Sequence, residues 1–411
     1  MPSDIPNPEE LSKASHLGTG LIVRYHEIAL KGGNRAMFEK RLDQNLQSAL
    51  SSFSRVSVRR IRGRMLVQSD TPASRMASAA AKVFGVSSIS AAVETEPDLD
   101  AIGESARAQV GKILERHYQG RDLVRFRVTS NRADKRFPLS STEMNGQIGG
   151  RILPEFPCLK VSLNDPEVEV EVDLRPEGTW VFSERFRGPG GLPVSSTGRA
   201  LSLLSGGIDS PVASWLSMKR GMRVDFVSFY SFPHVGPQTR DKIIRQVENL
   251  MKWQPRAMLH IVPFAPIQEA IRDFCPATYR TVLYRRAMQR IASKIAKRTK
   301  CKVLITGESV GQVASQTLNN LSVIEEASYV PVLRPLITFD KQETIDLAQK
   351  IGTFETSNLP APDCCTVFQP EHPVIYGQIE EAHAAEGPLD LDSLCATAVR
   401  ETERLHFPER S

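Results

Sequence analysis

A glycine turn, SGGIDSP over residues 205–211, carries the clearest chemistry in this 411-residue chain. It lies between an apolar run (200–205) and a predicted helix (210–220). Its two glycines let backbone N–H groups approach an anion and tolerate positive φ, and the start of a helix adds positive potential. Asp209 stands where a helix cap belongs, and Pro211 suits a first helical turn. The pattern predicts a phosphate or pyrophosphate site; the alternative is a capped strand–helix turn without a ligand.

The turn matches neither the Gly-x-x-x-x-Gly-Lys-Ser/Thr loop nor the Gly-x-Gly-x-x-Gly loop of other nucleotide sites. Because it contains no lysine, backbone amides and a metal must offset the charge of the phosphates. We expect Asp209 to hold Mg²⁺ on these phosphates.

Two adjacent cysteines, Cys364 and Cys365, follow the proline-rich stretch LPAPD. Adjacent cysteines rarely bridge each other, and this spacing is not that of a zinc site. A loop of this kind would leave a thiol accessible for nucleophilic chemistry. The alternative is two small buried apolar residues. The remaining cysteines have no motif around them, and we expect them to be structural: Cys158, Cys275, Cys301 and Cys395.

The elements that must position these residues fall into three blocks. Residues 20–80 and 80–185 read as α+β units with short apolar strands, and VEVEVDL (168–174) alternates like a half-buried strand. Residues 187–199 are rich in Gly, Pro and Ser, which is typical of a linker. From residue 200 onward, strands alternate with helices, which predicts a parallel sheet covered on both faces. Ligands bind such sheets beyond the carboxyl ends of the strands.

Charge is unevenly distributed along the chain. The net charge is +5, yet residues 251–300 contain 11 basic and two acidic residues, and residues 351–411 contain three basic and 11 acidic residues. This asymmetry favours a polyanionic partner, with solvated helix faces as the alternative. No apolar run approaches the ~20 residues that span a bilayer, and the N-terminus has no secretory pattern. We therefore expect a soluble cytoplasmic protein.

The glycine turn resembles the PP-loop of the ATP pyrophosphatases, which cleave ATP between the α and β phosphates and adenylate a carbonyl oxygen. With four further motifs, the chain resembles the tRNA uridine 4-sulfurtransferases (4-thiouridine synthetases, ThiI family) from about Gly20 to Phe368. The strings that carry this resemblance are RYHEIALKGGNR (24–35), FRVTSNRADKRFPLSSTEMNGQIGG (126–150), GPGGLPVSSTGRALSLLSGGIDSPVA (188–213), GESVGQVASQTLNNL (307–321) and DCCTVF (363–368).

The resemblance implies an α/β fold with a Rossmann-like PP-loop domain behind two α+β domains. These would be a ferredoxin-like domain (1–78), a THUMP RNA-binding domain (79–186), a linker (187–199), and a PP-loop domain with an acidic tail (200–411). It implies ATP and Mg²⁺, and it places ATP contacts on Leu203, Leu204, Ser205, Gly206, Gly207, Asp209, Ser210, Ser228, Phe229, Arg285, Gly307 and Gln316.

The resemblance also assigns the persulfide-carrying thiol to Cys365, with Cys364 as the second candidate. The segment after Cys365 is too short for the rhodanese domain that some members append, so sulfur is expected directly from a cysteine desulfurase. The family is further linked to the thiazole of thiamine, which would add a sulfur-carrier protein as a partner. The sequence leaves open whether the protein is a homodimer.

RNA contact is expected from basic residues beside an aromatic in the THUMP-like block: Arg127, Arg132, Lys135 and Arg136. The target uridine would have to leave its stack to reach the PP-loop domain. Three other functions remain open at this point: a different tRNA thiolase, an amidating ligase, and a non-catalytic RNA-binding protein.

Overall fold

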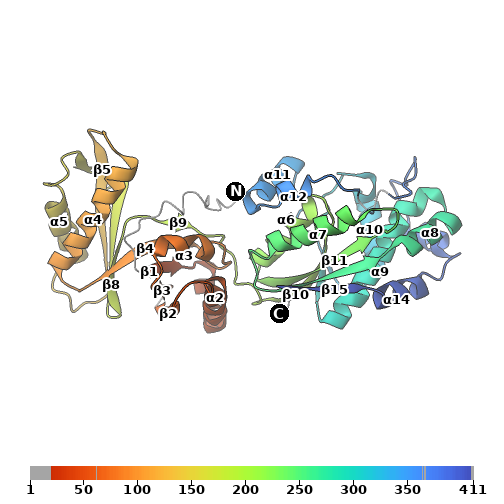
Figure 1. Ribbon diagram of the computed structural model, residues 1–411, viewed down its shortest axis with the longest axis horizontal. Helices are drawn as coiled ribbons and strands as arrows, with labels where there is room; N and C mark the ends of the chain where they lie inside the picture. The colour runs from red at the N-terminus through yellow and green to blue at the C-terminus, as the bar shows by residue number, and fades with distance from the viewer. Residues whose placement is uncertain (1–19, 62, 363, 365–366, 409–411) are drawn as a thin grey trace. The chain divides into compact units, whose positions relative to one another are not determined.

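The computed structural model describes residues 20–61, 63–362, 364 and 367–408, which form two compact units that divide between Pro193 and Val194 (Figure 1). The regular elements of the first unit are β1 (Gly20–Arg24), α2 (Arg35–Ala49), β2 (Ser57–Ile61), β3 (Arg64–Gln68), α3 (Ala73–Ala80), β4 (Ser88–Thr95), α4 (Leu99–His117), β5 (Val124–Arg132), α5 (Ser141–Ile152), β6 (Leu159–Val161), β7 (Val168–Arg175), β8 (Gly178–Phe182) and β9 (Phe186–Arg187).

The elements of the second unit are β10 (Gly198–Leu203), α6 (Asp209–Lys219), β11 (Met222–Tyr230), α7 (Pro237–Leu250), β12 (Ala257–Pro263), α8 (Ala265–Phe274), α9 (Arg280–Thr299), β13 (Val303–Ile305), α10 (Leu318–Glu326), β14 (Val332–Leu333), α11 (Lys341–Ile351), α12 (Phe354–Ser357), α13 (Ile379–Glu386), α14 (Leu391–Arg400) and β15 (Glu403–Phe407). In the described ranges, no helix has the length and apolar character needed to cross a bilayer.

The first unit is built on one sheet in the order β2-β3-β1-β4-β8-β7-β5-β6, with β9 paired to β4. The alternation predicted for VEVEVDL is present in β7 from Val168 to Val172, but Asp173, expected on the solvent side, is 1% exposed and pairs with Arg64 and Arg175. Helix α3 spans the predicted boundary between residues 78 and 79. Leu192, inside the predicted linker, is 4% exposed and packs in the core around α2 and α3.

The second unit has the predicted parallel sheet, in the order β14-β13-β10-β11-β12-β15. Strand β15 differs, because it pairs antiparallel with β12 and closes that edge. The expected acidic tail is therefore an integral part of the sheet. Helices lie on both faces of the sheet: α6 and α7 pack on one, and α8, α9 and α14 share the core on the other (Figure 1).

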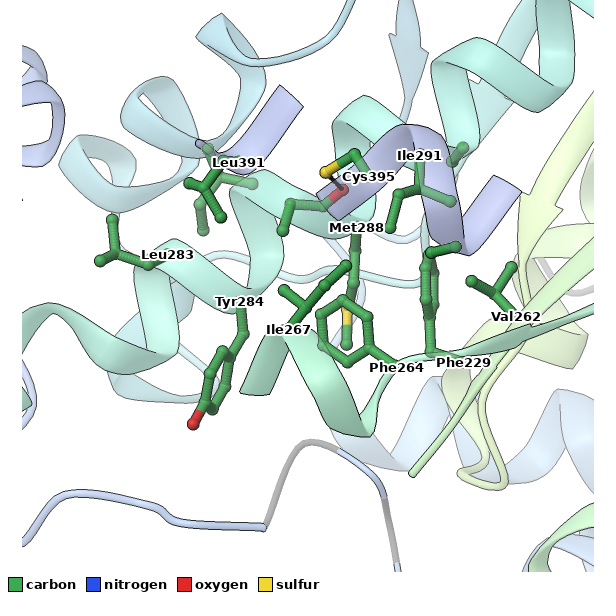
Figure 2. Packing of buried hydrophobic residues seen from close by; sticks show 14 of the residues in the cluster. Phe229, Val262, Phe264, Ile267, Leu283, Tyr284, Met288, Ile291, Leu391 and Cys395 are labelled. Atoms are coloured by element: carbon green, nitrogen blue, oxygen red, sulfur yellow. Dashed lines mark hydrogen bonds between the residues drawn. The ribbon is translucent and has the colours of Figure 1, made fainter. Parts of the chain in front are cut away.

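A large apolar core holds the second group of helices against the sheet. Phe229 and Val262 point from the sheet toward Ile267 of α8 and Met288 of α9, and α14 packs on the far side of α9 (Figure 2). Burial of this much apolar surface is the main stabilising contribution available to the unit. It fixes the carboxyl ends of the strands, where functional residues are expected.

Part of the charge asymmetry is internal to this unit. Arg286 on α9 is fully buried and donates from Nε to Oε1 of Glu386 at 2.7 Å. Arg290, one turn later, donates to Oε2 of Glu386 at 2.7 Å. Lys294 contacts Asp392 at 3.2 Å. The two alternatives offered for the basic stretch, a polyanionic partner or a solvated helix face, therefore do not apply to Arg286 and Arg290, because Glu386 in the acidic C-terminal segment neutralises them.

His260 on β12 should make the stability of the second unit depend on pH. Its side chain is 2% exposed, and Nε2 has no hydrogen-bond partner among the described residues. Burial lowers the pKa of its imidazole from 6.5 to about 4, against a smaller opposing effect of Asp225. Between pH 6.5 and about pH 4, the imidazole is protonated in the unfolded chain but not in the folded chain. The free energy of unfolding therefore decreases as pH falls through this range, by ~3 kcal/mol in all.

Urea unfolding at pH values near 7 and near 4.5 tests this contribution. The loss of unfolding free energy between the two pH values should be smaller for His260→Gln than for the parent chain, since glutamine does not titrate. An equal loss in both proteins would contradict the assignment.

Candidate active site

The glycine turn joins the end of β10 to the start of α6, as predicted. Its hydroxyls brace the turn: Ser210 Oγ accepts from the backbone N–H of Ser205 at 2.9 Å, and Ser205 Oγ accepts from the N–H of Gly207 at 3.3 Å. One local expectation was wrong: Asp209 is the first helical residue and makes no side-chain cap. The conformational tolerance of Gly206 and Gly207 is not used, because neither has positive φ. The first N–H groups of α6 still lack intrahelical partners, as at any helix start.

A cavity of about 460 Å³ opens over this turn at the carboxyl ends of β10, β11 and β13. Every residue expected to contact ATP lines it. These residues are Leu203, Leu204, Ser205, Gly206, Gly207, Asp209, Ser210, Ser228, Phe229, Arg285, Gly307 and Gln316. The structure thus brings together side chains that are up to 113 positions apart in the sequence.

Gly307, which follows β13, packs directly against the start of α6. A Cβ atom at residue 307 would lie 2.7 Å from the backbone nitrogen of Ser210 and 2.8 Å from the carbonyl carbon of Asp209. Contacts this short with backbone atoms do not occur without a shift of the chain. A glycine is therefore required here by close approach, and this approach sets the position of the helix start.

Two lysines beside the turn were missed by local sequence reasoning. Lys341, the first residue of α11, lies 2.8 Å from Oδ1 of Asp209. Lys242 of α7 lines the cavity, is 8% exposed, and would lie about 3.4 Å from a Cβ at residue 206. The turn itself has no lysine, but the fold supplies cations from two helices. No local pattern marks either residue, because each is placed only by tertiary packing.

Arg285 reaches the cavity from α9, where it is held by an acidic partner. Its Nη1 lies 2.8 Å from Oε1 of Glu308, and Glu308 also contacts Nε of Arg334 at 2.8 Å. Glu308 is 5% exposed. Arg285 is therefore oriented by a buried ion pair, while its neighbour Arg286 belongs to the separate network with Glu386.

The cysteine loop reaches the same cavity. Cys364 lines it with 8% of the residue exposed, and its carbonyl oxygen accepts from Nε2 of Gln268 at 2.8 Å. Cys365 lies outside the described residues. Of the four cysteines expected to be structural, Cys158 is partly exposed, and the other three are buried. Burial raises the pKa of Cys275 and of Cys301, and raises that of Cys395 to about 11. Such thiols are poor nucleophiles.

The basic residues expected to bind RNA lie within β5 (Arg127), at its end (Arg132) and in the segment that follows it (Lys135 and Arg136). Arg127 donates to Oε1 of Glu169 at 2.7 Å, and Arg136 pairs with Asp134 at 2.7 Å. Arg132 donates to the carbonyl oxygen of Phe137 at 2.9 Å. Intramolecular partners therefore hold the guanidinium groups of the three arginines, and Lys135 is exposed.

Three family models match the chain in sequence order. The ThiI ferredoxin-like domain matches residues 20–90, the THUMP domain matches residues 96–184, and the family described as thiamine biosynthesis protein (ThiI) matches residues 195–391.

Curated relatives cover almost the whole chain. A probable tRNA sulfurtransferase of Brevibacillus brevis is 42% identical over 384 residues, which is 93% of this chain and 95% of the relative. The probable tRNA sulfurtransferase of Geobacillus kaustophilus is 40% identical over 392 residues, covering 95% and 96% of the two chains.

Among solved structures, a 4-thiouridine synthetase–RNA complex with bound ATP superposes with a TM-score of 0.88 at 34% identity, covering 95% of this chain and 99% of that one. The protein PH1313 of Pyrococcus horikoshii superposes with a TM-score of 0.64 at 25% identity and covers 81% of this chain.

Proposed function

The chain belongs to the ThiI family of tRNA sulfurtransferases, and from this we propose that it makes 4-thiouridine, using ATP to activate the O4 atom of a tRNA uridine and replacing that oxygen with sulfur. The observation that carries the proposal is the shared cavity. A phosphate-binding turn and a cysteine loop line the same 460 Å³ space. A nucleotide and a sulfur carrier must meet in this way if one activates the base and the other attacks it.

In the first step, uridine O4 attacks the α-phosphorus of ATP, the bond to the β-phosphate breaks, and pyrophosphate leaves. Adenylation is needed because a pyrimidine carbonyl oxygen is a poor leaving group. The start of α6 and Lys242 offer positive potential to the phosphates. Leu203, Ser228 and Phe229 end two adjacent strands and provide a wall for the adenine.

Mg²⁺ on the phosphates would offset their charge, and the cavity lining fits a cation held mainly by phosphate. Asp209 and Glu308 are the carboxylates among the described lining residues, and Glu308 is already bound by two arginines. Mg²⁺ in nucleotide sites typically uses one or two protein carboxylates. Asp209 has one cationic partner in the described chain, Lys341 at 2.8 Å, so it is the carboxylate that would hold Mg²⁺ by exchanging this lysine for the ion.

In the second step, the outer sulfur of a persulfide on Cys365 bonds to C4, the C4–O bond breaks, and AMP leaves. The sulfur–sulfur bond between the base and Cys365 remains. A second thiol, from Cys364 or an external thiol, attacks the Cys365 sulfur, and the base sulfur leaves with the electron pair as 4-thiouridine. The resulting disulfide is restored by an external dithiol reductant.

We further propose that a cysteine desulfurase loads the persulfide directly, and that the same sulfur serves thiamine thiazole synthesis through a sulfur-carrier protein. The tRNA would contact Arg127, Arg132, Lys135 and Arg136 in the first unit, exchanging intramolecular partners for phosphates. A cytoplasmic location follows from the tRNA substrate, and we propose a homodimer. We propose that the boundary between the ferredoxin-like and THUMP domains lies later than residue 78, between residues 90 and 96, which the ends of the two family matches support.

The test is mass spectrometry of tRNA nucleosides after incubation with ATP, Mg²⁺ and a persulfide donor, with pyrophosphate measured in parallel. 4-Thiouridine should form, and pyrophosphate release should require tRNA. Pyrophosphate release without 4-thiouridine would indicate a different thiolase or an amidating ligase. The absence of both would indicate a non-catalytic RNA-binding protein.

Lys242→Met should raise the KM for ATP about 10- to 100-fold, because a charge-assisted contact to phosphate is worth about 1.5–3 kcal/mol. Methionine preserves length and apolar packing at this 8% exposed position. The ATP dependence of pyrophosphate release measures the effect. Lys252→Met removes the same charge from an exposed position and should leave KM unchanged. A parental KM in Lys242→Met would exclude the proposed contact.

A further inference from the structure

Side chains of three helices hold the described part of the cysteine loop by its backbone. Four carbonyl oxygens along residues 359–368 accept hydrogen bonds from α7, α8 and α9. The pairs are Lys242 Nζ with Leu359 at 2.8 Å, Thr239 Oγ1 with Pro362 at 3.0 Å, Gln268 Nε2 with Cys364 at 2.8 Å, and Arg280 Nη1 with Phe368 at 3.0 Å. Because every acceptor is a main-chain carbonyl, this clamp fixes the path of the loop independently of the side chains that the loop carries.

Gln268 is the member of the clamp that acts at the thiol pair. It is 0% exposed, and its Oε1 accepts a hydrogen bond from the hydroxyl of Ser231, which is also 0% exposed. An amide turned the other way would set Oε1 against the carbonyl oxygen of Cys364, which cannot donate. The orientation of the amide is therefore determined by both partners, and Nε2 faces the Cys364 carbonyl.

The clamp divides into two parts by its relation to the cavity. Thr239 and Lys242 line the cavity and also hold the loop, so changes there affect both the nucleotide and the loop. Gln268 holds the loop but is not among the lining residues. Its substitution therefore disturbs the backbone at Cys364 without changing a side chain that lines the cavity.

We infer that Gln268 is a positioning residue for sulfur transfer: it fixes the backbone at Cys364, the neighbour of the proposed persulfide carrier in the sequence, and takes no part in nucleotide binding or adenylation. The inference rests on the proposed function. Sulfur transfer depends on a near-attack geometry between the outer sulfur and C4, and a displacement of about 1 Å costs about 100-fold in rate. Adenylation needs only ATP and the uridine, so it does not depend on the loop in this way.

Gln268→Met tests the inference, because methionine is close in size and cannot donate to the carbonyl. The rate of 4-thiouridine formation should fall about 100-fold. The KM for ATP and the rate of tRNA-dependent pyrophosphate release should stay within about twofold of the parent, while alkylation of the loop thiols by iodoacetamide should become faster. The unchanged pyrophosphate release and the faster alkylation separate positioning from a general loss of stability.

Gln254→Met is the matched control. Gln254 is 3% exposed and makes two hydrogen bonds to the backbone of Val224, at the opposite end of β11 from the cavity. This variant removes comparable buried bonds, so it should lower stability without changing the ratio of 4-thiouridine to pyrophosphate. Should Gln268→Met fail to fold, Ser231→Ala frees the amide of Gln268 and should lower that ratio about tenfold.

An unchanged ratio in a folded Gln268→Met, or in Ser231→Ala where Gln268→Met does not fold, would overturn the inference, as would a parallel loss of both products. Failure of the proposed function would look different, since the parent enzyme itself would then form no 4-thiouridine.

Discussion

Gly307→Ala should reduce tRNA-dependent pyrophosphate release by about 100-fold. The added Cβ displaces the start of α6, which orients the phosphates, and a displacement of about 1 Å at a reacting group costs about this much in rate. The added Cβ would lie 2.7 Å from Ser210 N and 2.8 Å from Asp209 C, both backbone atoms of the helix start. A flexible side chain could move aside at low cost, but a helix start anchored to β10 cannot. The N–H groups of the turn would lose their alignment with the phosphates.

The measurement compares the pyrophosphate rate with the unfolding midpoint. Gly377→Ala is a suitable control, since a Cβ there would lie 2.7 Å from Oδ1 of Asn320, away from the cavity lining. Both variants should unfold more easily than the parent, but only Gly307→Ala should lose activity beyond what its unfolded fraction explains. If Gly307→Ala released pyrophosphate at the parental rate, the close contact of Gly307 with the start of α6 would not be needed to orient the phosphates.

The glycine turn could be predicted from the sequence because its physics is local. Two glycines, a short apolar strand before them and a proline inside the following helix determine a strand–turn–helix by themselves. Alternating strands and helices also predict that the carboxyl ends of the strands meet at one edge of the sheet. The twelve nucleotide residues themselves came from the family resemblance, and all of them line one cavity at this edge.

Features set by distant packing could not be predicted in this way. Lys242, Lys341 and Gln268 lie in ordinary helical patterns, and only the fold brings them to the turn and the cysteine loop. The internal partners of the charged residues could not be predicted for a related reason, because composition gives the amount of charge but not its partner. Arg286 and Glu386 are 100 positions apart, and they neutralise each other inside the unit.

Cys365→Ser should abolish 4-thiouridine formation while tRNA-dependent pyrophosphate release continues. Serine keeps the size of the side chain but cannot carry a persulfide, so activation of O4 proceeds without a sulfur donor. The adenylated uridine would then be hydrolysed, and AMP and pyrophosphate would accumulate with no modified base. Nucleoside mass spectrometry and a pyrophosphate assay on the same sample measure the two outcomes.

Cys364→Ser is the matched comparison, because it removes the neighbouring thiol. Cys364 is 8% exposed and its backbone is held by Gln268, so its thiol is poorly accessible to a sulfur donor protein. If Cys365 carries the persulfide and Cys364 resolves it, Cys364→Ser should stop with the tRNA joined to Cys365 through a disulfide bond, and it should release 4-thiouridine only when excess external thiol is added. The reverse pattern, with Cys364→Ser inactive under all conditions and Cys365→Ser rescued by thiol, would move the carrier role to Cys364 and leave the nucleotide chemistry of the cavity intact.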